Sequence, residues 1–188
     1  MNDRVVRMFL EANDRLHDAD ILARSLDARS DSQAIIRILG FEILLKCALL
    51  LAGQEPKESH NYKKLWLGLP GYVRKDVLKV AAERMPGHAD LSNIEDKLVW
   101  YQFVFERARY HYEIYENYSL KEQTELGDLW LSLGAPNSEA VIQYFPSELT
   151  CLIAGLTSYI ENAGNYRASV TEVPILNSPA VAQPPAWG

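Results

Sequence analysis

Residues 33–52 constrain the fold more than any other stretch, because a helix over this range is apolar on nearly every side. Such a helix has to lie at the centre of a fold, where each side packs against a neighbour. Its longest apolar run, residues 43–52, contains Lys46 and is too short to span a bilayer. The stretch therefore predicts a buried central helix with these apolar residues: Ile35, Ile36, Ile38, Leu39, Phe41, Ile43, Leu44, Leu45, Leu49, Leu50 and Leu51.

The other segments have the spacing of amphipathic helices, and none has the alternation and hairpin turns of β-strands. Long helices are expected over residues 2–26, 94–118 and 138–163, with Pro146 kinking or restarting the last one. Shorter helices are expected over residues 61–69, 72–85 and 120–133. The predicted fold class is all-α, an up-and-down four-helix bundle with short inserted helices and a proline-rich C-terminal arm.

The chain of 188 residues is expected to form one helical domain over residues 1–166. Residues 167–188 contain four prolines and cannot form a continuous helix. They form an extended proline-rich tail, which is either floppy or lies as an arm on a surface.

Charge and composition exclude several classes of function. The 19 basic and 25 acidic residues give a net charge of −6, so no overall attraction to nucleic acid or to an anionic membrane is expected. The first residues lack the apolar stretch of a signal peptide. Cys47 and Cys151 lie in apolar helical stretches; they could pair, but buried free thiols of a reducing compartment are expected. We therefore expect a cytoplasmic location and no membrane partner.

The sequence lacks the common motifs for cofactors and metals. There is no GxGxxG, Walker, CxxC, HExxH or EF-hand pattern. The Glu-x-x-His pairs of di-iron bundles are missing too, because no histidine follows a glutamate at that spacing. No cofactor and no metal site are expected.

Glu42 and Lys46 lie four residues apart on the apolar central helix, and therefore on one side of it. A carboxylate in such surroundings needs a partner, because burying an unpaired charge is costly. Lys46 can supply it, or Arg109 can approach from the third long helix as a bidentate partner. The three residues predict a buried polar network, which either fixes the register of the helices or lines a functional cleft.

A run of tyrosines and charges over residues 105–118 gives a second candidate site. On one continuous helix Arg107 and His111 stack, while Arg109 and Glu113 stack on roughly the opposite side. A neutral imidazole can act as a general base and an arginine can hold a phosphate, so Arg107 and His111 are candidate catalytic residues. The alternative is a packed helix end. The candidate cleft residues are Glu42, Lys46, Arg109, Tyr110, Tyr112 and Glu113.

Residues 57–84 carry seven basic and three acidic residues, a local charge of +4 in an acidic chain. Aromatic side chains lie among them, and basic residues interleaved with rings suit single-stranded nucleic acid. His60, Lys63 and Lys64 are therefore candidates for binding RNA or a nucleotide. The alternative is a solvated helical hairpin.

Three stretches together resemble the HEPN family of prokaryotic helical-bundle domains. They are Phe41-Glu42-Ile43-Leu44-Leu45-Lys46, His60-Asn61-Tyr62-Lys63-Lys64-Leu65 and Arg109-Tyr110-His111-Tyr112-Glu113. The resemblance implies a homodimer in a toxin–antitoxin or phage-defence setting, where a nucleotidyltransferase-like antitoxin is a possible partner. Catalytic members are metal-independent endoribonucleases with an arginine, four to six residues and a histidine at a cleft between subunits, whereas other members only bind partners.

Two functions follow from the resemblance and the residues. Three residues separate Arg107 from His111, fewer than in the catalytic members. The first function is therefore a non-catalytic homodimeric interaction or regulatory module, with the aromatic third long helix as its dimer face. The alternative is an RNA-binding protein or metal-independent endoribonuclease that uses Arg107 and His111.

Overall fold

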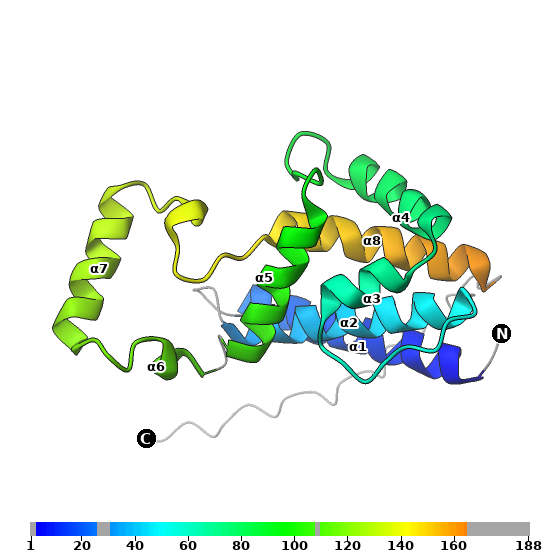
Figure 1. Ribbon diagram of the computed structural model, residues 1–188, viewed down its shortest axis with the longest axis horizontal. Coiled ribbons are helices and arrows are strands. Elements are labelled where there is room, and N and C mark those ends of the chain that lie inside the picture. Colours follow the sequence, from blue (N-terminus) through cyan, green and yellow to red (C-terminus); the bar gives the residue numbers. More distant parts are fainter. Residues whose placement is uncertain (1–2, 26–30, 108–109, 165–188) are drawn as a thin grey trace, which may run out of the picture.

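The computed structural model describes residues 3–25, 31–107 and 110–164, which form helices and connecting segments with no β-strand among them (Figure 1). The helices are α1 Asp3–Ser25, α2 Asp31–Leu51, α3 Tyr62–Gly68, α4 Gly71–Arg84, α5 Ile94–Arg107, α6 His111–Ile114, α7 Leu120–Ser132 and α8 Pro146–Ala163, with a 3₁₀ helix, η2, at Asn137–Glu139. The all-α prediction is confirmed. The predicted tail, residues 167–188, lies outside the described residues.

The predicted central helix is confirmed as α2. It packs along α1 and α8 and also contacts α3 and α5. Ile38, Phe41, Leu44 and Leu45 are completely buried, as a helix that is apolar all round requires. No helix in the described part of the chain is long and apolar enough to cross a membrane.

α1 and α2 pack tightly against each other at Gly40. A Cβ atom at Gly40 would lie 3.0 Å from the Leu16 side chain and 3.2 Å from the Ala12 carbonyl oxygen. Ala12 itself is fully buried. Small residues on both helices therefore let the two backbones approach, and an ion pair between Asp20 and Arg37 joins the same helices.

Aromatic rings connect α2, α3, α5 and the start of α8. The Phe41 ring lies 6.1 Å from Tyr62 and 6.0 Å from Tyr101, in both cases edge to face. The Tyr101 hydroxyl donates a hydrogen bond of 2.8 Å to the Phe145 carbonyl oxygen. Burial, the largest cause, raises the pKa of this phenol well above its ordinary value, so Tyr101 stays a neutral donor.

The predicted last helix begins later than expected. Residue 138 lies in η2, and α8 begins at Pro146. Proline fits the first turn of a helix, where its missing N–H group would have no partner in any case. Pro146 therefore starts the helix, and the predicted helix over residues 138–145 is wrong.

The predicted third long helix over residues 94–118 is also wrong. α5 ends at Arg107, and Tyr110 has the non-helical dihedral angles φ −116° and ψ 48°. α6 is a separate helix of four residues. The chain therefore turns away from the other helices in the tyrosine-rich run.

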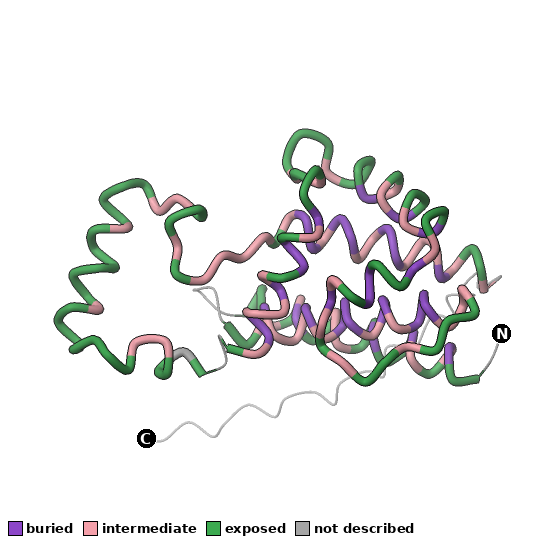
Figure 2. Tube along the Cα trace, viewed as in Figure 1, coloured by how far each residue is buried: buried purple, intermediate pink, exposed green. Residues whose placement is uncertain are grey.

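Residues 110–145, which we call the protruding segment, contain α6, α7 and η2. They extend to one side of the other helices in Figure 1, and α7 stands farthest out. Figure 2 shows that this part is mostly exposed, whereas α2 and α8 are largely buried. None of the 13 residues of α7 is buried. The expected helix over residues 120–133 thus exists, but it adds no buried residue to the core.

Candidate functional site

Glu42 is the centre of a polar cluster on α2. The residue is only 3% exposed, and both of its carboxylate oxygens accept a hydrogen bond. Lys46 Nζ donates to Oε1 over 2.7 Å, and His60 Nδ1 lies 2.8 Å from Oε2. Because a carboxylate only accepts, Nδ1 carries the proton in this contact. The cluster therefore satisfies the buried charge.

His60 is held in place by local structure on three sides. It precedes Asn61, whose side-chain oxygen accepts from the Lys64 N–H over 2.8 Å and caps α3. The imidazole ring lies 4.9 Å from the Phe105 ring of α5. The contacts with Glu42, α3 and α5 therefore fix the end of the connection that follows α2.

In this cluster the Glu42 carboxylate is balanced by a positive charge and held in one orientation. Lys46 balances the charge of Glu42, and the side chain of His60 is 51% exposed. Two ligands are too few for a metal, and the described residues contain no group of three or more metal-ligating side chains. The cluster joins the segment before α3 to the central helix.

The predicted network is found in part, with a different third member. Glu42 and Lys46 pair as expected. Arg109 lies outside the described residues. His60, predicted as a nucleic-acid contact, is instead the second partner of Glu42, although 18 residues separate them. The signal that could have found it is a polar side chain directly before the Asn61 cap, close in sequence to the end of the central helix.

The predicted stacking of Arg107 and His111 depends on one continuous helix. The two residues belong to separate helices, α5 and α6. The non-helical backbone of Tyr110 lies between them, so the four-residue spacing does not have its helical meaning here.

Tyr110, Tyr112 and Glu113 lie in the protruding segment and contact one another. The rings of Tyr110 and Tyr112 are 6.4 Å apart, and the Tyr112 hydroxyl donates to Glu113 over 3.4 Å. The nearby Glu113 charge, the largest cause, raises the pKa of Tyr112. These residues belong to the surface of the protruding segment, and the Glu42 carboxylate has other partners.

The basic stretch is partly neutralised by α5. Lys63 Nζ forms an ion pair of 2.9 Å with Glu95, and this contact raises the pKa of Lys63. Lys64 is exposed. One of the two lysines predicted to bind RNA therefore has an acidic partner already.

The protruding segment exposes apolar surface, and sequence patterns singled out its tyrosines but not its leucines. Amphipathic spacing had indicated a helix here, but it cannot tell whether the apolar side is covered. Nine large apolar side chains of the segment are 41–84% exposed: Tyr110, Tyr112, Tyr118, Leu120, Leu126, Leu129, Leu131, Leu133 and Val141.

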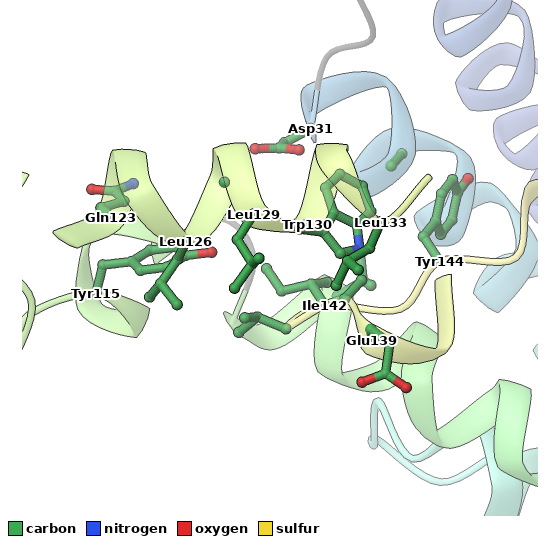
Figure 3. Close-up of a pocket in the computed structure, with 15 residues that line it drawn as sticks. Asp31, Tyr115, Gln123, Leu126, Leu129, Trp130, Leu133, Glu139, Ile142 and Tyr144 are labelled. Atoms are coloured by element: carbon green, nitrogen blue, oxygen red, sulfur yellow. The ribbon is translucent and has the colours of Figure 1, made fainter. Parts of the chain in front are cut away.

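A cavity of about 710 Å³ lies between α7 and the rest of the protein. Leu129, Trp130 and Leu133 point from α7 toward Ile142 in Figure 3. Ala34 of α2 and Val104 of α5 belong to its opposite wall. Its lining is mainly apolar, with several polar groups: Asp31, Tyr115, Gln123, Glu139 and Tyr144.

The two cysteines are expected to be unreactive in the folded protein. Both are buried free thiols. Burial raises the pKa of Cys47 to about 12 and also raises the pKa of Cys151, so neither forms the reactive thiolate at neutral pH. Titration with a thiol-reactive disulfide reagent should detect no thiol until denaturant is added, and then two. Reaction of the native protein at the rate of free cysteine would contradict the burial.

No protein-family model, no curated protein and no solved structure matches this chain.

Proposed function

We propose that this chain is a homodimeric interaction module without catalytic activity and that the protruding segment supplies its contact surface. The observation that carries the proposal is α7, a regular helix with no buried residue. Leu120 and Leu131 on this helix are 84% and 62% exposed. Large apolar side chains exposed together on one element are typical of a surface that a partner covers.

Local hydrogen bonds stabilise α7 as a helix before a partner binds. The Ser119 hydroxyl accepts from the Glu122 N–H, and the Glu122 carboxylate accepts from the Ser119 N–H over 2.8 Å, which completes a capping box. Hydrogen bonds from Ser119 lower the pKa of Glu122 and keep it charged. A helix stabilised by its own residues loses little further conformational entropy when it binds.

The exposed surface is large enough for a second copy of the chain. Five exposed apolar side chains do not line the cavity: Tyr110, Tyr112, Tyr118, Leu120 and Leu131. At roughly 100 Å² each they offer roughly 500 Å². A partner in a standard interface contributes about 800 Å², a little over half of it apolar. Every copy carries the same surface, so a symmetric dimer buries it twice.

The wider setting is proposed from the HEPN resemblance. In this proposal α1, α2, α5 and α8 are the long helices of an up-and-down four-helix bundle. The contact between Glu42 and His60 supports it, because it joins two of the three stretches that carry the resemblance. The module would then act in a prokaryotic defence or toxin–antitoxin type system, with a second protein such as a nucleotidyltransferase-like antitoxin as a further partner.

RNA binding or cleavage is the less favoured function. Arg107 and His111 do not share a helix, and Glu95 pairs with Lys63. The first feature weakens the case for catalysis by Arg107 and His111, and the second weakens the case for RNA binding by Lys63. We therefore propose a module without catalytic activity.

Light scattering after size exclusion tests the dimer. Wild type should give twice the chain mass of 21.3 kDa at micromolar concentration. Leu131→Glu should raise the dimer dissociation constant at least about thirtyfold, because it places a charge in the apolar contact. Leu10→Glu is the matched control, since Leu10 is 49% exposed on α1. A wild type that stays at 21.3 kDa, or equal effects of the two variants, would refute the proposal.

A further inference from the structure

We propose that the cavity beneath α7 is a binding site for a small apolar molecule that carries a positive charge. Its volume of about 710 Å³ lies within the range of small-molecule sites, about 300–1,000 Å³. Such sites are lined mainly by apolar and aromatic side chains with a few polar groups, as this one is.

Part of the cavity wall is already fixed in position. The Trp130 indole N–H donates to the Pro136 carbonyl oxygen over 3.0 Å, which orients the ring on the α7 side. Val104, on the opposite side, is 3% exposed and belongs to the hydrophobic core. An apolar molecule between these walls would cover Leu129 and Leu133, which are 57% and 64% exposed without it.

The polar groups of the cavity favour a cation. Asp31 and Glu139 lie on opposite sides of the apolar cluster in Figure 3, and neither carboxylate forms an ion pair with a described residue. The described lining contains no lysine or arginine. Aromatic faces such as that of Trp130 also attract cations.

The residues around the cavity also carry a net negative charge. The protruding segment contains six acidic residues and one lysine, a net charge of −5 in a chain of −6. Acidic charge concentrated around a cleft raises the local concentration of cations and repels anions.

The cavity and the proposed dimer contact use different sides of α7. Leu120 and Leu131 lie within about 20° of each other on the helix, whereas the centre of Leu126, Leu129 and Leu133 lies roughly 160° away. Small-molecule binding therefore does not depend on dimerisation, and the monomerising Leu131→Glu variant should retain it.

Titration calorimetry with tetraphenylphosphonium and tetraphenylborate tests the site, because these ions have nearly the same shape and opposite charge. The phosphonium should bind one per chain and about five- to tenfold more tightly than the borate, as exposed carboxylates and a ring face allow. Trp130→Ala should weaken binding at least about tenfold, whereas Trp100→Ala, which alters a tryptophan outside the cavity lining, should not.

Two double variants that remove the same charge distinguish the effect of the carboxylates in the cavity from the effect of the overall negative charge. Asp31→Asn with Glu139→Gln should reduce phosphonium affinity about fivefold. Glu125→Gln with Asp128→Asn removes the same charge from exposed positions that do not line the cavity and should have a smaller effect. Circular dichroism confirms that each variant is folded. No phosphonium binding, equal binding of the two ions, or equal losses in the two double variants would overturn the proposal.

Discussion

Gly155→Ala is expected to lower the free energy of unfolding by about 3 kcal/mol. Gly155 lies on α8 where that helix packs against α4. A Cβ atom there would lie 2.3 Å from the Val77 carbonyl oxygen and 3.0 Å from its carbonyl carbon. Because these atoms belong to the backbone of α4, the clash cannot be relieved by a side-chain rotation. The two helices must move apart, which opens the core around Val77.

The intrinsic preference of alanine for helices opposes this loss by about 1 kcal/mol, too little to offset the clash. Gly71→Ala is the matched control, because a Cβ atom at Gly71, on α4, meets nothing within 4 Å. Chemical denaturation should show the large loss for Gly155→Ala and little change for Gly71→Ala. A loss below about 1 kcal/mol at Gly155 would mean that α4 and α8 are farther apart than described.

Glu42→Ala is expected to lower the free energy of unfolding by about 2–3 kcal/mol. The substitution removes the acceptor for Lys46 and for His60 and leaves a space beside α2. The cost stays below that of a fully buried ion pair, because the side chains of Lys46 and His60 are 21% and 51% exposed and can turn toward water. Denaturant unfolding measures the loss.

Two further variants show whether the loss of stability is specific to Glu42. Glu58→Ala removes an exposed carboxylate from the segment that precedes His60 and should change stability by no more than about 0.5 kcal/mol. His60→Ala should lose less than Glu42→Ala, since Lys46 still pairs with the carboxylate. If Glu42→Ala cost no more than Glu58→Ala, Glu42 would not anchor the cluster.

Sequence patterns predicted the helices but not all of their ends. α2 was predictable as the central helix because its apolar residues occur on every side. Proline indicated where α8 could restart, as it does at Pro146. The break at Tyr110 was not predictable in the same way, because no glycine or proline stands between Arg107 and Tyr118.

The candidate site was predictable only where spacing along one helix determines it. The pair of Glu42 and Lys46 follows from the four-residue spacing on α2. The contact of Glu42 with His60 depends on how the connection after α2 returns to the core, which local patterns do not encode. The exposure of α7 is likewise a property of tertiary packing, because amphipathic spacing predicts the helix but not what covers its apolar side.

Hydrogen exchange of the α7 amides at several protein concentrations tests most directly whether a second copy covers the protruding segment. Isolated α7 has few contacts that slow exchange, whereas docking against a partner protects its amides. Exchange of residues 120–132 should slow at least about tenfold from the monomeric to the dimeric concentration range. Residues 149–160 of α8, largely buried within one chain, should exchange at the same rate throughout. Exchange of α7 that is rapid at every concentration would contradict the account.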